Sequence, residues 1–277
     1  MSTNNNVKEE VRKAYGKIAK TGSSCCSSSS CCGSADSAQD ISRAVGYSDE
    51  DMSSVPDGAN LGLGCGNPVA IASLKEGDVV LDLGSGAGFD AFIASGKVGT
   101  SGRIIGVDMT EEMIERARLN AKKGNYKNVE FRLGEIEKLP VEDDSVDAII
   151  SNCVINLSQD KEKVFKESFR VLKPCGKIFI SDIVLLRALP KIIMSSLEAY
   201  VGCIAGASMK DDYLNYIKTA GFKKINIIDQ TAFAFDTMLN DIIIKDIKGS
   251  DIKQEDLEKI GDSVVSIKIQ AEKSEDI

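Results

Sequence analysis

The sequence contains no histidine among its 277 residues, and this absence excludes two classes of site. Acid–base catalysis by imidazole and metal sites with imidazole ligands both need that side chain. Long apolar runs are missing as well, since none approaches the roughly 20 residues that span a bilayer. Basic residues are outnumbered by acidic ones, 34 to 42, which gives a net charge of -8. We therefore expect neither nucleic acid nor a membrane as a partner.

We also expect no export signal, because the first ten residues contain no apolar core. We therefore expect a cytoplasmic protein, a compartment in which cysteines remain reduced. The chain has eight cysteines, and reduced cysteines serve metal binding or redox chemistry more often than structural disulfides. Thiols are thus the soft ligands that this protein has at its disposal.

Composition divides the chain into three regions, 1–74, 75–185 and 186–277. The first combines an amphipathic helix over 7–20 with a cysteine-rich Ser/Gly stretch that has too little apolar surface to order itself. A short helix and a turn follow over 40–57. In the second region the pattern of apolar residues changes, and we expect this region to be the main folding unit. We expect the third region to form a cap over it.

Short apolar runs alternate with helical segments in the second region, which predicts a mostly parallel sheet with helices on both faces. The expected strands cover 79–83, 103–108, 129–132, 146–151 and 177–182, and the expected helices 88–96, 110–123 and 160–172. Helices over 190–222 and two last strands over 224–229 and 264–270 complete seven strands. Thr110, followed by two glutamates, is expected to cap its helix. The fold class is therefore α/β.

A glycine-rich loop, Asp82-Leu83-Gly84-Ser85-Gly86-Ala87-Gly88, follows the first strand and opens a helix. Glycines at such a turn let the backbone approach a ligand closely. The acidic residue that ends the second strand, Asp108, is placed to hold a pair of ribose hydroxyl groups. The glycine spacing differs from the dinucleotide fingerprint, so the interpretation depends on the order of strand, loop, helix, strand and acid. That order predicts a nucleotide-type ligand.

Residues 75–185 resemble the class I S-adenosylmethionine (SAM) methyltransferases, which have a Rossmann-like fold. The resemblance implies that Asp82 and the glycines line the amino-acid half of SAM and that Asp108 binds its ribose. Met109 and the segment after the third strand would border the adenine. The implied cofactor-binding residues are Asp82, Gly84, Ser85, Gly86, Gly88, Asp108, Met109, Gly134, Glu135, Ile136 and Asn152.

Three cysteines stand where a methyl-transfer pocket is expected. Cys153 directly follows the fourth strand, and ligands of open α/β sheets bind beyond the carboxyl ends of strands. Cys65 lies among three glycines, and Cys203 lies between two glycines in the helices after the fifth strand. Plainer interpretations exist, because a buried cysteine packs as a small hydrophobe and Cys65 fits a flexible linker. From the residues alone, Cys203 is undecided between packing and ligand binding.

The segments around these cysteines resemble the arsenite SAM methyltransferases over about residues 7–230. The matching phrases are Asn60 to Pro68, Asp82 to Asp90, Gly134 to Glu137, Ser151 to Leu157 and Ala199 to Cys203. The resemblance implies that Cys65, Cys153 and Cys203 bind As(III) as thiolates, in a reaction that detoxifies arsenic. SAM would be the methyl donor, arsenite or its thiol conjugate the substrate, and glutathione or a thioredoxin-type protein the reductant.

The family also implies roles for residues near the amino terminus. Cys32 would take part in handing over arsenic or in relaying a disulfide during turnover, and Tyr15 and Gly16 would fold onto the cofactor. A disordered thiol-rich loop that collects thiophilic ions is an equal alternative for Cys32 and for the other cysteines of that stretch, Cys25, Cys26 and Cys31. Adjacent cysteines point apart, which disfavours one Cys₄ zinc site. Cys175 lies in an expected turn before the fifth strand and is interpreted as structural or incidental.

Arsenic chemistry suits a chain without histidine. Trivalent arsenic is soft and thiophilic, so thiolates are matching ligands. Three thiolates leave its lone pair free to attack the sulfonium methyl group, and no proton leaves arsenic in that step. Methylation of oxygen, nitrogen or carbon usually calls for a general base. Acidic side chains can also serve as a base, so the missing histidine favours arsenic without deciding.

Two other functions stay open. A SAM-dependent methyltransferase of a small organic acceptor, such as a quinone precursor, would make the three cysteines incidental. A non-catalytic thiol-rich protein that binds arsenic or metals would have no use for an intact glycine loop and Asp108. Arsenite methylation accounts for both features together, and we therefore expect it.

Overall fold

The computed structural model describes residues 3–22, 35–232, 261 and 263–275. The strands are β1 (Val79–Leu83), β2 (Arg103–Asp108), β3 (Val129–Leu133), β4 (Val146–Asn152), β5 (Leu172–Leu185), β6 (Lys223–Ala232) and β7 (Val264–Glu272). The longer helices are α1 (Thr3–Thr21), α2 (Ala35–Ala44), α5 (Phe89–Val98), α6 (Glu111–Lys123), α7 (Lys161–Val171) and α10 (Lys210–Thr219). The short ones are α3 (Asp49–Ser53), α4 (Pro68–Ile71), η1 (Ile155–Leu157), α8 (Lys191–Met194) and α9 (Leu197–Val201).

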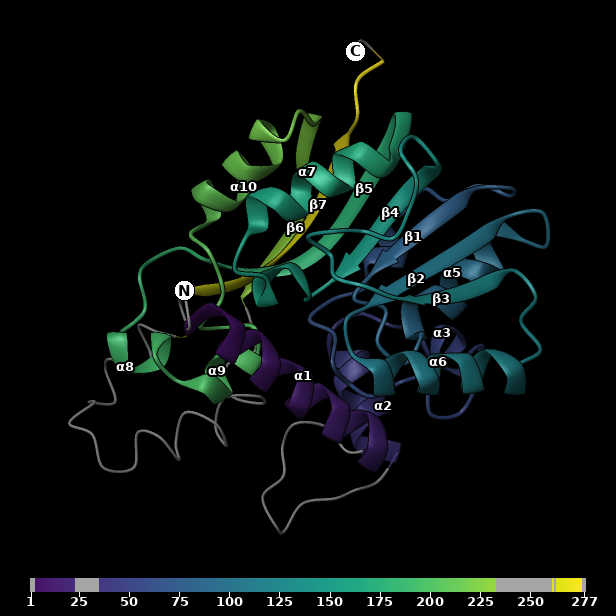
Figure 1. Cartoon of the computed structure of the whole chain (residues 1–277), viewed down its shortest axis with the longest axis horizontal. Coiled ribbons are helices and arrows are strands. Elements are labelled where there is room, and N and C mark those ends of the chain that lie inside the picture. Colours follow the sequence, from purple (N-terminus) through teal and green to yellow (C-terminus); the bar gives the residue numbers. More distant parts are fainter. Residues whose placement is uncertain (1–2, 23–34, 233–260, 262, 276–277) are drawn as a thin grey trace.

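All seven strands form one sheet in the order β3-β2-β1-β4-β5-β7-β6 (Figure 1). The pairs among β1 to β5 are parallel, and β7 runs antiparallel to both of its neighbours. The strand order reverses between β1 and β4, where ligands of open parallel sheets bind. The expected class I methyltransferase fold with a mostly parallel seven-stranded sheet is confirmed. In the described residues, no helix has the length and apolar character needed to cross a membrane.

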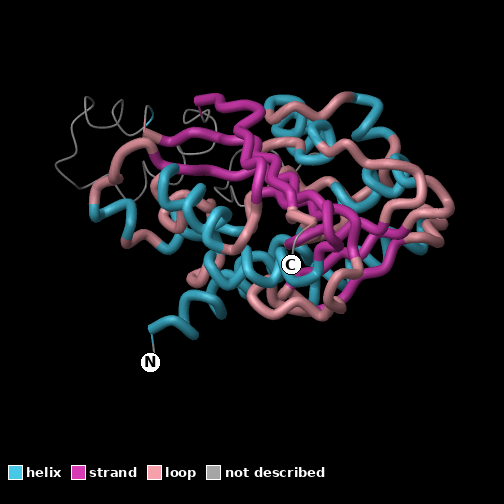
Figure 2. The backbone as a smooth tube through the Cα atoms, turned by 90° about the horizontal axis from the view of Figure 1, so that it is seen from above, coloured by secondary structure: helices cyan, strands magenta, loops and turns pink. Residues whose placement is uncertain are grey.

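Helices lie on both sides of the sheet (Figure 2) because alternate strand residues face opposite ways. Leu81 belongs to the apolar core that contains Phe165 of α7 and Tyr213 of α10. Its neighbour Val80 belongs to the core on the other face, which contains Phe92 of α5. Parallel strands buried on both faces read as continuous apolar runs, which is why they were predictable from the sequence.

Helix α1 connects distant parts of the chain along one edge of the fold. It contacts α6 of the central region and α9 of the carboxyl-terminal region, and it crosses between them in Figure 1. Strands β6 and β7, from the region beyond residue 185, complete the same sheet as β1 to β5. The second and third regions thus share one sheet, and the first region contributes helices that pack against it and against its covering helices.

Three local expectations differ from the structure. The helix expected within 40–57 is two helices, α2 and α3, of which the first begins at Ala35. Thr110 stands at the amino terminus of α6, but its side chain makes no capping hydrogen bond. Its backbone N–H instead donates to Asp108 Oδ1 at 2.8 Å. Cys175 lies inside β5 rather than in a turn before it, because the strand begins at Leu172 and Cys175 N–H donates to Lys273 O.

Lys273 is a buried lysine whose ammonium group ties three segments together. Its side chain is 3% exposed, and Nζ donates to Phe169 O at 2.8 Å, to Leu172 O at 2.7 Å and to Asp144 Oδ1 at 2.6 Å. We expect Lys273→Met to keep the aliphatic volume and to lower the free energy of unfolding by about 2–3 kcal/mol, because one buried and one partly buried carbonyl lose their donor. Urea unfolding measures the loss.

The matched control for this substitution is Lys224→Met. Lys224 forms an ion pair with Glu272 at 2.8 Å, but its side chain is 70% exposed. Exposed ion pairs contribute about 0–1 kcal/mol, so this variant should unfold at nearly the wild-type urea concentration. Equal losses in the two variants would contradict the role assigned to Lys273.

Candidate functional site

Polar side chains gather where the central strands end. Asp82 lies in β1, Asp108 ends β2 and Asn152 ends β4, and these strands are neighbours in the sheet. An open cavity lies over the strand ends, and all three side chains line it. Helix α1 supplies part of the opposite wall through Lys8 and Tyr15.

Most residues expected to bind the cofactor border this cavity. They are Asp82, Gly84, Ser85, Gly86, Asp108, Met109, Ile136 and Asn152. The lining does not include Gly88, Gly134 or Glu135. A Cβ on Gly88 would meet the rings of Phe92 and Phe131, so this glycine serves packing. Glu135 forms ion pairs with Lys8 at 2.8 Å and Arg12 at 2.6 Å and thereby holds α1 in place.

The glycine loop needs a glycine at position 84 for two reasons. Gly84 has a φ of +65°, a left-handed conformation that favours glycine. A Cβ at this position would also overlap the side chain of Val154. The loop therefore presents bare backbone to the cavity, which lets a ligand lie directly against it.

Asp82 is the group in the cavity that most needs a ligand. Asp82 is 2% exposed, and within the described part of the chain its Oδ2 has no hydrogen-bond partner. Burial raises the pKa of this carboxyl well above its usual range, and the charges of Asp90 and Asp108 raise it further. A cationic ligand group would satisfy Oδ2 and would stabilise the ionised carboxylate.

Asp108 is oriented by backbone groups. Gly86 N–H donates to its Oδ2 at 3.0 Å and Thr110 N–H to its Oδ1 at 2.8 Å. Burial raises the pKa of Asp108, and these hydrogen bonds act in the opposite direction. Each carboxylate oxygen can accept a further bond, so the pair of ribose hydroxyls expected here fits the geometry.

Tyr47 and Asp90 belong to the site although the sequence did not single them out as binding residues. Tyr47 Oη donates to Asp90 Oδ1 at 2.6 Å, and both residues line the cavity. Burial raises the pKa of Asp90 to about 6. The carboxylates of Asp82, Asp90 and Asp108 give the cavity a negative character. Asp90 follows the glycine loop directly, a signal that was available, whereas nothing in the sequence marked Tyr47.

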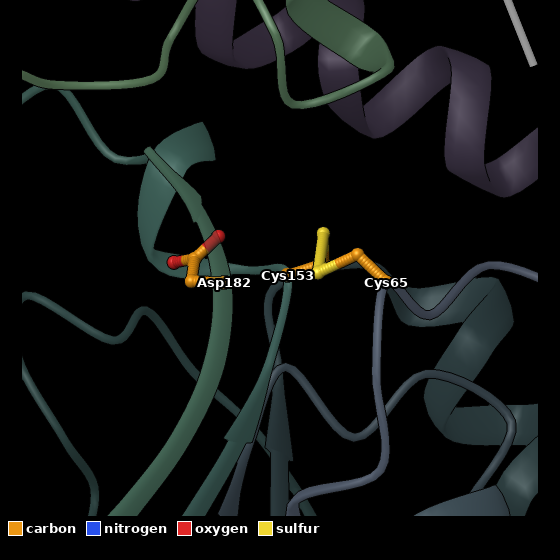
Figure 3. A group of neighbouring side chains, drawn as sticks. All are labelled: Cys65, Cys153 and Asp182. Carbon is orange, nitrogen blue, oxygen red and sulfur yellow. A yellow bond between two sulfur atoms is a disulfide. The ribbon is translucent and has the colours of Figure 1, made fainter. Parts of the chain in front are cut away.

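The three cysteines singled out in the sequence meet beside this cavity. Cys65, Cys153 and Cys203 are 5%, 6% and 3% exposed, and all three belong to one apolar cluster. Cys65 and Cys153 are joined by a disulfide (Figure 3), and Cys203 Sγ lies 2.7 Å from Cys153 O. The structure thus brings the three together, but two of them are oxidised rather than the free thiols expected in the sequence. Cys32 lies outside the described residues, as do Cys25, Cys26 and Cys31.

Asn152 holds Cys65 against Cys153. Its Oδ1 accepts the N–H of Cys65 at 3.1 Å, and its Nδ2 donates to Gly66 O at 2.8 Å and to Asp90 Oδ2 at 3.0 Å. The loop approaches so closely that a Cβ on Gly64 would lie 2.6 Å from Asn152 Nδ2. Asn152 lines the cavity, as expected, but its amide is already committed to protein partners and therefore positions the cysteine loop.

We expect Asn152→Ala to weaken the pairing of the two cysteines. The hydrogen bonds of Asn152 to Cys65 N–H and to Gly66 O disappear, which lowers the effective concentration of one thiol at the other by about tenfold. Equilibration in a glutathione redox buffer, followed by alkylation and peptide mass spectrometry, measures this concentration. Asn120→Ala is the control, because buried Asn120 donates to Ala87 O in the glycine loop and does not touch Cys65. A wild-type value for Asn152→Ala would contradict the positioning role.

The chain resembles known methyltransferases in sequence as well as in fold. Residues 74–221 match the family model described as a methyltransferase domain. Arsenite methyltransferases from Halobacterium salinarum and Mus musculus are 47% and 32% identical, over 80% and 78% of this chain. The chain spans 58% of the length of each.

Solved structures extend the comparison. An arsenic(III) SAM methyltransferase from Chlamydomonas reinhardtii is 31% identical, with a TM-score of 0.61, over 84% of this chain and 73% of that one. A Haemonchus contortus phosphoethanolamine N-methyltransferase solved with SAM shares the fold, with a TM-score of 0.58 at 20% identity, over 76% of this chain and 53% of that one. The chain belongs to the methyltransferase domain family and, within it, to the arsenite methyltransferases.

Proposed function

We propose that this protein transfers the methyl group of SAM to trivalent arsenic held by Cys65, Cys153 and Cys203. The observation that carries the proposal is the convergence of three cysteines, from three separate segments, beside a cavity with an acidic wall. A carbon, nitrogen or oxygen acceptor has no use for such a cluster. Membership in the arsenite methyltransferases supports the same reaction.

The cavity has the features that SAM requires. SAM carries an ammonium and a sulfonium cation, and the unsatisfied Oδ2 of Asp82 and the neighbouring carboxylate of Asp90 complement positive charge. The bare backbone after Gly84 admits its amino-acid half, and Asp108 accepts its ribose hydroxyls. Met109 and Ile136 offer apolar surface for the adenine. When bound, SAM supplies an electrophilic methyl group.

The protein contributes position rather than proton transfer. Three thiolates would hold arsenic with its lone pair free, and Cys153 both lines the cavity and belongs to the cysteine cluster. The nucleophile would therefore sit at the boundary between the two sites. Fixing the two reactants in line lowers the barrier by up to about 7–11 kcal/mol. No general base is needed, in keeping with the absence of histidine.

The disulfide sets a requirement for the cycle. Cys65 and Cys153 bind arsenic only after their bond takes up two electrons and two protons, so two thiols of a reductant must become a disulfide in exchange. Glutathione or a thioredoxin-type dithiol meets this need, and Cys32 is our candidate for relaying the exchange within the chain. Such reductants belong to the cytoplasm, where we place the protein.

A turnover assay with SAM, arsenite and excess thiol tests the proposal. Products are separated by chromatography with arsenic-specific detection, and methylated arsenicals are expected. A chain that binds SAM but forms no methylated arsenic would contradict the proposal and favour a small organic acceptor. Failure to bind SAM would contradict the interpretation of the glycine loop.

A further inference from the structure

The cysteine pocket contains an acidic group that arsenic chemistry does not use. Asp182 of β5 is fully buried, and one of its carboxylate oxygens lies within 4.8 Å of the Sγ atoms of both Cys65 and Cys153. Figure 3 shows the carboxylate on the strand that faces the two sulfurs. Trivalent arsenic is satisfied by sulfur alone, so the proposed methyl transfer gives Asp182 no role.

We propose that reduced Cys65 and Cys153 form, together with Asp182, a binding site for zinc. Zinc takes four ligands in a tetrahedron and accepts thiolate sulfur and carboxylate oxygen together. In such a site neighbouring ligand atoms lie about 3.3–3.8 Å apart. The three atoms already lie within 4.8 Å of one another, and reduction of the disulfide lets the two sulfurs move apart to admit the ion.

Asp182 is oriented as a metal ligand usually is. Its Oδ1 accepts hydrogen bonds from Asn156 Nδ2 at 2.8 Å and from Ile183 N–H at 2.9 Å, and its Oδ2 accepts one from Tyr213 Oη at 2.8 Å. Hydrogen bonds from neighbouring groups fix carboxylate ligands in this way. Oδ1 is filled by its two hydrogen bonds, whereas Oδ2, which accepts one, keeps a lone pair for an ion.

The charges balance when zinc is bound. Two thiolates and one carboxylate carry three negative charges, and the cation neutralises two. The third is opposed by Lys161, a mostly buried lysine whose Nζ donates to Ser158 O at 3.0 Å. Burial lowers the pKa of Lys161, while the charges of Asp182 and Cys203 raise it. Arsenic(III) and three thiolates are already neutral and need no such balance.

Binding follows a defined stoichiometry. A dithiol or phosphine reductant first converts the disulfide to two thiols, and zinc then displaces one proton from each thiol while Asp182 enters as a carboxylate. Zinc and arsenic share two sulfurs and therefore exclude one another. The pocket thus binds one of two ligands. Trivalent arsenic takes Cys203 as its third sulfur, whereas zinc takes Asp182 as its oxygen ligand.

The test uses the full chain with the five cysteines outside the pocket changed to serine, namely Cys25, Cys26, Cys31, Cys32 and Cys175. After phosphine reduction, titration of zinc against a chromophoric chelator should give one ion per chain, with at least 100-fold weaker binding to the oxidised form. Asp182→Asn should weaken zinc binding at least tenfold. The same variant should bind phenylarsine oxide, an arsenical that takes two thiols, with unchanged affinity.

Asp108→Asn is the control, because it removes another buried carboxylate but one that faces the SAM cavity. Its zinc affinity should equal that of the parent chain. Wild-type zinc binding by Asp182→Asn, or equal binding by the oxidised chain, would overturn the proposal. If Asp182→Asn does not fold, X-ray absorption on the reduced parent decides: two sulfurs with oxygen ligands support the site, and a shell of sulfur alone or oxygen alone overturns it. If the reduced parent chain binds no zinc but methylates arsenic, this inference is refuted and the proposed function still stands.

Discussion

Cys153→Ser is expected to lower the rate of arsenic methylation by about two orders of magnitude or more while SAM still binds. Cys153 lies at the end of β4, lines the cofactor cavity and pairs with Cys65, so no other cysteine of the described chain can replace its sulfur between the two sites. A hydroxyl is a poor ligand for a soft atom. Arsenic held by the remaining sulfurs would be displaced from the line of attack, and a displacement of about 1 Å costs a factor of about 100 or more in rate.

The measurement compares initial rates of arsenic methylation at saturating SAM, together with the dissociation constant of SAM. We expect the rate to fall by about two orders of magnitude or more, with SAM affinity within twofold of wild type. Cys175→Ser is the matched control, because this thiol is exposed, lies in β5 and pairs with Glu275 at 3.1 Å. A Cys153→Ser enzyme that keeps a tenth of its turnover would exclude the three-thiolate site.

The location of this site was predictable because it follows from where strands end. Asp82, Asp108 and Cys153 each stand at the carboxyl end of a buried apolar run, and parallel strands bring such ends to one edge. The same signal was present for Asp182, which ends the expected strand over 177–182, yet it was not used. Its partner Tyr213 comes from α10 and lies 31 residues further along the chain.

Contacts between segments that are far apart in the sequence could not be predicted from local sequence patterns. Tyr47 and Asp90, which share a hydrogen bond, are 43 residues apart in the sequence, and Cys65 and Asn152 are 87 residues apart. Neither pair leaves a periodic trace in the sequence, because both depend on how the loop before β1 folds over the sheet. The disulfide was not predicted either, since the expected compartment favours thiols and pairing depends on redox poise as well as on distance.

The three cysteines were predicted from two different sources, the position of a strand end and the resemblance to a family. Position relative to a strand end marked Cys153 alone, whereas Cys65 and Cys203 stood in glycine-rich segments with several interpretations. The resemblance supplied their common role, and the structure supplies the reason that they meet. Cys65 is held through Asn152 and Ser266, whose Oγ donates to Cys65 O at 3.0 Å, and Cys203 contacts the backbone of Cys153.

Asp82→Asn is expected to weaken SAM binding by about 10- to 100-fold. The amide keeps the size of the carboxyl group but loses its charge, and a hydrogen bond to a charged group contributes about 1.5–3 kcal/mol. Asp82 Oδ2 has no partner in the described chain, so its charge is available to the ligand alone. Isothermal titration with SAM measures the effect. Asp211→Asn, at an exposed position in α10, is the control and should bind SAM as wild type does.

The pH dependence of SAM binding follows from the same carboxylates. Burial raises the pKa of Asp90 to about 6, so Asp90 takes up a proton as the pH falls through that value. Burial also raises the pKa of Asp82 well above its usual range, so Asp82 is protonated at a higher pH than an ordinary aspartate. A protonated carboxyl no longer attracts the SAM cation, and the bound cation in turn favours the ionised form. SAM affinity should therefore be higher at pH 8 than at pH 5.5. The slope should be shallower in Asp82→Asn, which has one titrating group fewer, and an unchanged slope would show that Asp82 does not face the cation.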